Sequence, residues 1–238
     1  MRLGIMQPYF FPYLGHFGLI ANCDHWVVFD ITQYTPKTWM NRNRVLHPSA
    51  GSMYVTVPLS NSSQSILTVE ARVQDPAQAH SSIRGRLSHY KRFAPFYREV
   101  LRLVDGVFEG LAGDSLVELD VAALRMACAY LELPFHYSIC SELDLDLKRP
   151  CGPGGWAPAI AQALDADAYV NPAGGRSLFD RQDFARRGID LLFAEMPTFV
   201  YDTGPFAFEP QLSILDVLMW NSPERVRETL DTATLTSA

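Results

Sequence analysis

The sequence predicts an α/β fold with a mixed or mainly parallel sheet, a β-rich insertion at about residues 40–73 and a helical middle segment at about 76–131. Short apolar runs typical of buried strands alternate with helical patterns towards both ends of the chain. A strand, a helix and a second strand fit within the first 30 residues, so parallel neighbours are their simplest arrangement. The 238 residues are 48% hydrophobic and 19% charged, which suits a single domain with a sizeable core.

The N-terminal part of the chain is predicted to begin with a compact β–α–β unit. Its elements are a strand at residues 2–7, a short helix at 14–22 and a buried strand at 25–30, HWVVFD. Further on, residues 53–59 (MYVTVPL) and 66–73 (ILTVEARV) alternate apolar and polar side chains, as half-buried strands do. The sequence NSSQS between them is typical of a turn, so a hairpin is expected within the insertion.

The rest of the chain is predicted to contain helices and short strands. Three helices, at 77–90, 94–111 and 116–131, make up the middle segment, and Asp114 or Ser115 is the expected N-cap of the third. Residues 141–155 are rich in Pro and Gly and are expected to form a flexible or lid-like loop. The other expected elements are strands at 136–140, 167–170 and 189–193, helices at 156–164 and 181–187, and two final helices after Ser213, which forms a capping-box-like pair with Asp216, and after Ser222.

Composition and charge limit the classes of function. The net charge of −6 and the pI of about 5.5 argue against non-specific binding to nucleic acid or to anionic membranes. The four cysteines and six histidines show no metal-binding spacing and no P-loop is present, so neither a metal nor a cofactor is predicted. Without a secretory signal or an apolar run of about 18 residues, a cytoplasmic location is expected.

The stretch MQPYFFPYLGHF, residues 6–17, connects the first strand to the first helix. A strand that ends in a tight turn and leads into a helix presents backbone N–H groups, and ligands of open α/β sheets bind at the carboxyl ends of strands. Gln7 and Gly15 would lie there, with Tyr9 and Tyr13 as aromatic walls. The alternative is that the aromatic residues are core packing and that the glycine is a helix–sheet contact, and both interpretations stay open.

The same stretch is similar to a nucleotidylyltransferase pattern, in which a strand is followed by Phe-Pro and then by His-x-Gly-His. The string FPYLGHF keeps Gly15 and His16, but Tyr13 replaces the first histidine. A histidine pair would contact phosphates, which a tyrosine does only in part. A degenerate nucleotidylyltransferase is therefore an alternative function.

A second group of polar residues lies in WMNRNRVL. In an extended chain Asn41 and Asn43 would face one way, and the two arginines, Arg42 and Arg44, the other. An arginine fork binds carboxylate or phosphate bidentately, while two amides can orient a polar ligand or hold a loop. Further polar and aromatic residues precede this group closely, namely Asp30, Gln33, Lys37 and Trp39. Their density favours a ligand-binding role over a solvated turn.

A third candidate is the stretch YVNPAGGRSLFD. Asn171 directly follows a predicted strand, and Gly174 with Gly175 permits a backbone nest that could bind an anion. A plain glycine turn explains this sequence equally well.

Taken together, these motifs resemble the WbqC-like protein family. The resemblance rests on IMQPYFFPYLGHFGLI, VVFDITQY, WMNRNRVL, VPLSNSS, YKRFAPFY, YVNPAGGRSLFD with GIDLLF, and LSILDVLMWNS, in that order over nearly the whole chain. One departure is His16, where the family usually has Tyr or Phe. The residues that match the family motifs are Gln7, Pro8, Pro12, Gly15, Asp24, Asp30, Gln33, Asn41, Arg42, Asn43, Asn171, Gly174, Gly175, Ser213 and Asp216.

The resemblance implies a cytoplasmic bacterial protein with a group-transfer role, because such proteins tend to be encoded beside genes for surface polysaccharides and natural-product assembly. Acyl or aminoacyl transfer to an amine or hydroxyl is the expected reaction, on a small-molecule or carrier-bound substrate. The alternative from another class is a non-catalytic binding or scaffold protein of a biosynthetic complex. No oligomeric state is predicted.

The predicted site residues divide by role. Arg42 would anchor an anionic group of the activated donor, and Asp30 or Asp216 would act as base for the acceptor. The amides that would orient or polarise a carbonyl are those of Gln7, Asn41 and Asn43. The remaining predicted substrate-binding residues are Tyr9, Gly15, Gln33, Lys37, Asn171, Gly174 and Gly175.

Overall fold

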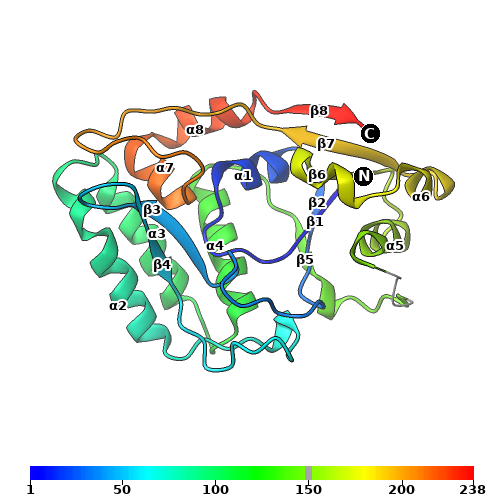
Figure 1. Ribbon diagram of the computed structural model, residues 1–238, viewed down its shortest axis with the longest axis horizontal. Coiled ribbons are helices and arrows are strands. Elements are labelled where there is room, and N and C mark those ends of the chain that lie inside the picture. The colour runs from blue at the N-terminus through cyan, green and yellow to red at the C-terminus, as the bar shows by residue number, and fades with distance from the viewer. Residues whose placement is uncertain (148–151) are drawn as a thin grey trace.

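A six-stranded sheet lies at the centre of the computed structural model, which describes residues 1–147 and 152–238 (Figure 1). In spatial order the strands are β5 (Tyr137–Ile139), β2 (His25–Val28), β1 (Arg2–Met6), β6 (Ala168–Pro172), β7 (Asp190–Glu195) and β8 (Thr234–Ser237). Neighbouring strands are parallel except for β7 and β8, which are antiparallel. The expected α/β fold with a mainly parallel sheet is confirmed.

Two buried clusters cover the two faces of the sheet, because its strands carry apolar residues at successive positions. Leu3 of β1 belongs to the cluster that includes α5 (Trp156–Ala163) and α6 (Arg181–Arg186). Trp26 of β2 belongs to the other cluster, which includes α1 (Leu14–Ala21) and the helical middle of the chain. Apolar residues on both faces thus give the sheet its doubly covered form.

The strand order fixes where successive connections diverge. From β1 the chain proceeds to β2 and β5 on one side, and it then returns to β6 on the other side of β1. Ligands of open α/β sheets bind outside the carboxyl ends of the strands at such a point. Gln7, which follows β1, and Asn171, in β6, both lie at this edge.

The helical middle segment consists of α2 (Pro76–Leu87), α3 (Tyr97–Glu109) and α4 (Leu116–Tyr130), as expected. Side-chain caps begin two of these helices: Asp75 accepts a hydrogen bond from the N–H of Gln78 at 3.0 Å, and Ser115 N-caps α4. Short 3₁₀ turns lie at Thr68–Glu70, Ser88–Arg92, Cys140–Glu142, Pro153–Gly155 and Ala173–Leu178.

A second, two-stranded antiparallel sheet lies in the insertion and consists of β3 (Arg42–Leu46) and β4 (Ser52–Thr56). The β-rich insertion is confirmed, but the predicted hairpin of residues 53–59 with 66–73 does not form, since Leu59 and Val73 pair only in an isolated bridge. In the described structure residues 66–73 form isolated bridges and a 3₁₀ turn, and β4 pairs with β3 instead. The sequence gives no strand signal for β3, because the inward side of this strand carries Asn43, a buried polar residue, between two arginines.

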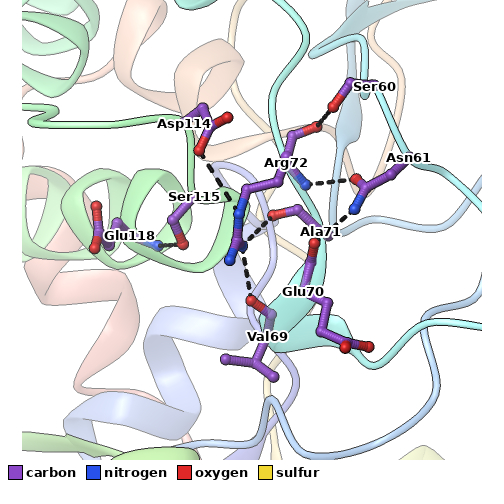
Figure 2. A network of polar contacts seen from close by, with 9 residues as sticks. All are labelled: Ser60, Asn61, Val69, Glu70, Ala71, Arg72, Asp114, Ser115 and Glu118. Atoms are coloured by element: carbon purple, nitrogen blue, oxygen red, sulfur yellow. Dashed lines mark hydrogen bonds and ion pairs between the residues drawn. The ribbon is translucent and has the colours of Figure 1, made fainter.

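Arg72 fastens the irregular chain after β4 to the start of α4 (Figure 2). Its backbone N–H donates to Asn61 Oδ1 at 2.8 Å, and its Nη1 donates to the carbonyls of Val69 and Ala71 at 2.8 and 3.1 Å. Its Nε lies 3.6 Å from a carboxylate oxygen of Asp114, just before the cap of α4. These side-chain bonds add to the backbone bonds that join residues 71–74 to residues 58–60 and 114–116.

The C-terminal helices α7 (Ile214–Trp220) and α8 (Pro223–Leu230) follow their expected caps. Ser213 Oγ accepts from the N–H of Leu215 at 3.2 Å. The capping-box half of that prediction is not found, because the Ser213 N–H donates to the carbonyl of Arg44 at 2.8 Å. The start of α7 is thereby tied to β3.

Two further expectations concern the loop at 141–155 and the end of the chain. Residues 148–151 of the predicted flexible loop lie outside the described residues, and 3₁₀ turns occupy both flanks of the loop. The antiparallel edge strand β8 was not predicted, since Thr234–Ser237 is short and mostly polar.

Candidate functional site

The corner between β1 and α1 is held in a strained conformation by distant side chains. Phe11 has a φ of 41°, which is rare for a bulky residue. Its carbonyl accepts from Asn43 Nδ2 at 2.9 Å and from Ser213 Oγ at 2.7 Å, and the same amide of Asn43 donates to the Phe10 carbonyl at 3.1 Å. Strain of this kind persists only where the surroundings enforce it, and it clusters at functional sites. Asn43 therefore positions the corner.

The aromatic residues of the corner divide between the core and the surface. Phe10 and Phe11 are fully buried core residues. Tyr9 and Tyr13, on either side of them in the sequence, instead line open space beside the start of α1. Core packing thus holds the corner, while the tyrosines face outward from it.

The first turn of α1 presents backbone N–H groups. Tyr13 is the N-cap residue, but its side chain makes no capping hydrogen bond. An uncapped helix start carries a partial positive charge and N–H groups without helical partners, and here the His16 N–H donates to the Tyr13 carbonyl at 3.0 Å. A Cβ atom on Gly15 would overlap the ring of Tyr13, so glycine is needed for that ring to lie against the helix.

Two adjoining hollows open beside this helix start and share Tyr13 and Gln211, a non-glycine residue with a φ of 55°. The first, of about 150 Å³, lies between the start of α1 and the segment after β7, where Phe199 and Tyr201 form part of its wall. The second, of about 210 Å³, lies between the corner and β3, and its walls include Tyr9, Trp39, Asn43 and Arg44.

The polar groups of these hollows include two phenols and a guanidinium. Neither the Tyr9 nor the Tyr13 hydroxyl has a hydrogen-bond partner within the described chain. Burial raises the pKa of both phenols, with Tyr13 adding to the effect on Tyr9, so both are protonated donors at neutral pH. Arg44 takes part in none of the ion pairs of the described residues. The second hollow therefore offers hydrogen-bond donors and positive charge, whereas the wall of the first also includes the acidic residue Glu209.

Asp216 lies behind a wall of the first hollow. Its fully buried carboxylate accepts from the Tyr90 hydroxyl, from the Tyr201 hydroxyl at 2.7 Å and from the Leu46 N–H at 3.3 Å. Burial raises the pKa of Asp216, and these hydrogen bonds oppose the shift. Because Tyr201 lines the hollow and Asp216 does not, this carboxylate would act on a ligand only through the phenol.

Asp30 is also fully buried, at the end of β2. Its two carboxylate oxygens accept from the Ser141 N–H at 2.9 Å and from the Ser141 hydroxyl at 2.6 Å, which joins the ends of β2 and β5. Neither predicted base, Asp30 or Asp216, lines the two hollows. Their role as bases stays a prediction and is left out of the proposed function.

Gln7, Asp30 and Arg42 contact different neighbours in the described structure. Gln7 Nε2 donates to Thr32 Oγ1 at 3.2 Å, whereas Arg42 Nη2 donates to the carbonyl of Lys37 at 2.6 Å. Lys37 is exposed and has a φ of 61°. No hydrogen bond of the described structure joins these three residues to one another, so a shared site for them stays a prediction.

Two other predicted site residues use their side-chain amides to bond backbone carbonyls. Gln33 Nε2 donates to the carbonyl of Gln64, and Asn41 Nδ2 donates to the carbonyl of Val57 at 2.9 Å. Both contacts stabilise the irregular parts of the insertion. A substrate-binding role for these two amides stays a prediction.

Asn171 packs against the turn that follows β6. It is 8% exposed, and its Nδ2 donates to the Tyr169 hydroxyl. A Cβ atom on Gly175 would overlap the Asn171 side chain, whereas Gly174 has open space around it. The glycine at 175 is thus explained by close packing, and an anion nest in this turn stays a prediction.

His16 lies inside the molecule, between aromatic rings. It is 1% exposed, its ring centroid lies 5.0 Å from that of Trp26 and 5.7 Å from that of Tyr9, and its Nε2 has no hydrogen-bond partner in the described structure. Burial lowers the pKa of His16 to about 3. A neutral, enclosed imidazole is a poor phosphate ligand, so this geometry does not favour nucleotidyl transfer.

Sequence reasoning included Arg44 in the polar group of WMNRNRVL but gave it no role of its own, and it did not single out Tyr201 or Gln211. The position of Arg44, two residues after Arg42 on the outer side of a strand, is the signal that could have given it that role. Tyr201 and Gln211 lie between β7 and α7, where the sequence has no periodic pattern and no turn motif that marks a site.

Comparisons with known proteins agree with the sequence motifs. The model of the WbqC-like protein family matches residues 7–228. The chain belongs to this family. It is 28% identical over 221 residues to a protein of Mycobacterium tuberculosis (strain ATCC 25618 / H37Rv) named "Uncharacterized protein Rv1507c", and the match covers 91% of this chain and 92% of that one. No solved structure matches the chain.

Three further findings bear on the chemistry of this WbqC-like chain. Over residues 1–147 and 152–238, no helix is long and apolar enough to cross a membrane, and no group of three or more His, Cys, Asp or Glu side chains could hold a metal ion. Burial raises the thiol pKa to about 12 for Cys23 and Cys128 and to about 11 for Cys140. These three cysteines are therefore protonated, weak nucleophiles. Cys151 lies outside the described residues.

Proposed function

We propose that this protein is a group-transfer enzyme that moves an acyl or aminoacyl group to an amine or hydroxyl, in natural-product or surface-polysaccharide biosynthesis. Its site would be the pair of hollows that share Tyr13 and Gln211. The observation that carries the proposal is the pair of free phenol hydroxyls, Tyr9 and Tyr13, beside Arg44 and the uncapped start of α1.

This arrangement suits a reaction at a carbonyl group. The lone pair of the acceptor attacks the carbonyl carbon, a C–N or C–O bond forms, and negative charge develops on the carbonyl oxygen. Protonated phenols and free backbone N–H groups stabilise that charge as fixed donors do in an oxyanion hole. The bond to the leaving group then breaks, and the leaving group departs with its electron pair and the proton of the acceptor. Arg44 would hold an anionic part of the substrate.

The test is a transfer assay with a panel of acyl and aminoacyl thioesters and adenylates, amine and alcohol acceptors, and product detection by mass spectrometry. For an active pair, Tyr13→Phe should lower kcat by about 10²- to 10³-fold with a small change in KM, the usual result of removing an oxyanion donor. The control Tyr130→Phe, a half-buried tyrosine of α4, should keep the wild-type rate.

Two outcomes would contradict the proposal. Full turnover by both Tyr9→Phe and Tyr13→Phe would refute the role of the phenols. Thermal stabilisation by members of the panel without any product would favour the alternative, a non-catalytic binding protein of a biosynthetic complex.

A further inference from the structure

The outer side of β3 carries an exposed group of cationic and aromatic side chains. Arg42 and Arg44 are two positions apart on this strand, so both point to the same side. The neighbouring aromatic residues are Trp39, just before the strand, and Tyr54 of β4, which lies opposite Arg44. We call these four residues the arginine face.

The aromatic rings hold the two guanidinium groups in place. The guanidinium carbon of Arg42 lies 4.2 Å from the ring centroid of Tyr54, and that of Arg44 lies 5.9 Å from the ring of Trp39. The two rings are themselves 6.4 Å apart, and Trp39 and Tyr54 are each 40% exposed. Stacking fixes the plane of each guanidinium. The Nη atoms of Arg44 make no hydrogen bond in the described structure and are free for an anion, whereas Arg42 already donates through Nη2 to the Lys37 carbonyl.

The charge of this face is not compensated within the described residues. Arg42 and Arg44 are absent from the ion pairs found there, and the Nε atoms of both are buried without a hydrogen-bond partner. The carbonyl of the exposed Lys37 accepts a hydrogen bond from Arg42. Two cations without ion-pair partners, side by side on a chain of net charge −6, indicate a binding site for a multiply charged anion.

We propose that the arginine face binds a phosphate ester, so that the donor of the transferred group carries phosphate at the mouth of the second hollow. The link to the donor rests on the proposed function, because Arg44 and Trp39 belong both to this face and to the wall of that hollow. A carboxylate brings one negative charge, whereas a phosphate monoester brings up to two and offers three acceptor oxygens to the guanidinium N–H groups. The ester belongs either to a free coenzyme, which carries more than one phosphate group, or to the prosthetic arm of a carrier protein, a phosphodiester with one charge and two free oxygens.

The direct test is the binding of inorganic phosphate and pyrophosphate to the intact protein, by calorimetry at low ionic strength, with acetate as the comparison. Arg42→Gln and Arg44→Gln should each weaken pyrophosphate binding at least about tenfold, since each removes a charge-assisted contact. Arg181→Gln is the matched control, because this exposed arginine lies on α6 at the far end of the molecule (Figure 1). Its pyrophosphate affinity should equal that of the wild type.

Unfolding curves and tryptophan emission show whether the glutamine variants keep their fold, and Arg42→Lys with Arg44→Lys provides a milder pair. Lysine keeps the charge but loses the fork, so an intermediate affinity is expected. An absence of saturable pyrophosphate binding to the wild-type protein would overturn the inference, whatever the variants do. Equal affinity in the wild type and in both glutamine variants would overturn it as well.

The two sources of the ester are distinguished with coenzyme A and with an acyl carrier protein in its holo and apo forms. Arginine-dependent binding of coenzyme A indicates a free coenzyme, and arginine-dependent binding of only the holo carrier indicates the prosthetic arm. Equal, arginine-independent binding of holo and apo carrier, without coenzyme binding, would contradict the inference.

The inference and the proposed function can fail separately. Phosphate binding that needs the arginines, without transfer from any donor, would leave the inference standing and remove the proposed function. If both glutamine variants instead transferred groups from phosphate-free donors at the wild-type rate, the proposed function would stand and the inference would fall.

Discussion

Replacing Asn43 by alanine should release the corner between β1 and α1 and lower the stability of the fold. The side chain is 4% exposed, donates to the carbonyls of Phe10 and Phe11, and accepts the Arg44 N–H at 2.8 Å. Alanine keeps the β3 backbone and removes all three interactions. The strained Phe11 carbonyl would then keep one of its two side-chain donors, the hydroxyl of Ser213.

The magnitude follows from these contacts. Three hydrogen bonds at about 1 kcal/mol net each give about 3 kcal/mol, and the buried Phe10 carbonyl left without the amide adds about 1 kcal/mol. The free energy of unfolding should therefore fall by about 3–4 kcal/mol. Asn221 is a matched control: it is 2% exposed, donates to the Val217 carbonyl at 2.8 Å, and its Oδ1 has no partner in the described structure. Asn221→Ala should cost about 1 kcal/mol or less.

Urea unfolding followed by circular dichroism gives both free energies. Hydrogen exchange of the backbone amides at residues 9–11 and 13 reports on the corner itself, and these amides should exchange faster in Asn43→Ala and at the wild-type rate in Asn221→Ala. An Asn43→Ala protein that unfolds within about 1 kcal/mol of the wild type, with unchanged exchange at the corner, would refute this account of how the corner is held.

Three other changes test neighbouring parts of the account. Asp120→Asn should stabilise the protein increasingly as pH rises. Asp120 is fully buried, its oxygens have no partner in the described structure, and burial raises its pKa, so the native state binds the proton more tightly than the unfolded chain does. The stability of the wild type therefore falls from about pH 4 up to the raised native pKa, by up to about 1.4 kcal/mol per pH unit. Urea unfolding at several pH values checks this, and a stability difference that does not grow with pH contradicts it. Gly15→Ala should displace the Tyr13 ring and impair transfer while keeping the helical content of α1, and an unmoved ring in a crystal structure of the variant would show that the glycine is not needed there. Tyr201→Phe removes one donor to Asp216 and should lower the free energy of unfolding by about 1–2 kcal/mol in urea titrations, whereas an unchanged midpoint would show that this hydrogen bond adds nothing.

Local signals in the sequence were sufficient for most of the main sheet. The run HWVVFD predicts a buried strand, and β2 forms there, parallel to β1. Ser222 followed by proline predicts the start of α8, and Gly188 predicts the end of α6, where it has a φ of 71°. Caps and apolar runs act within a few residues, so sequence alone reveals them.

The pairing of the insertion depended on contacts that no local pattern encodes. Alternation correctly placed Asn43 on the opposite side of the chain from Arg42 and Arg44. It could not show that the buried amide bonds the carbonyls of Phe10 and Phe11, more than thirty residues away. A buried polar residue with a distant partner looks like a loop residue in the sequence, and this explains both the missed strand β3 and the wrong hairpin.

The structure places some of the predicted site residues beside the two hollows and others away from them. Tyr9 and Gly15 were predicted substrate-binding residues, and they line the two hollows beside the start of α1. Asp30 and Asp216 were predicted as bases because they are carboxylates, yet both are buried among hydrogen-bond donors. Sequence gives the chemical type of a side chain, whereas its exposure depends on the packing of the whole fold.

A crystal structure of the protein with a bound donor or product analogue, taken from the transfer or binding assays, would test the central claim most directly. The account predicts a carbonyl oxygen within hydrogen-bond distance of the Tyr9 or Tyr13 hydroxyl and an anionic group at Arg44. A ligand bound instead at the ends of β1 and β6, against Gln7 and Asn171 and away from Tyr13 and Arg44, would contradict it.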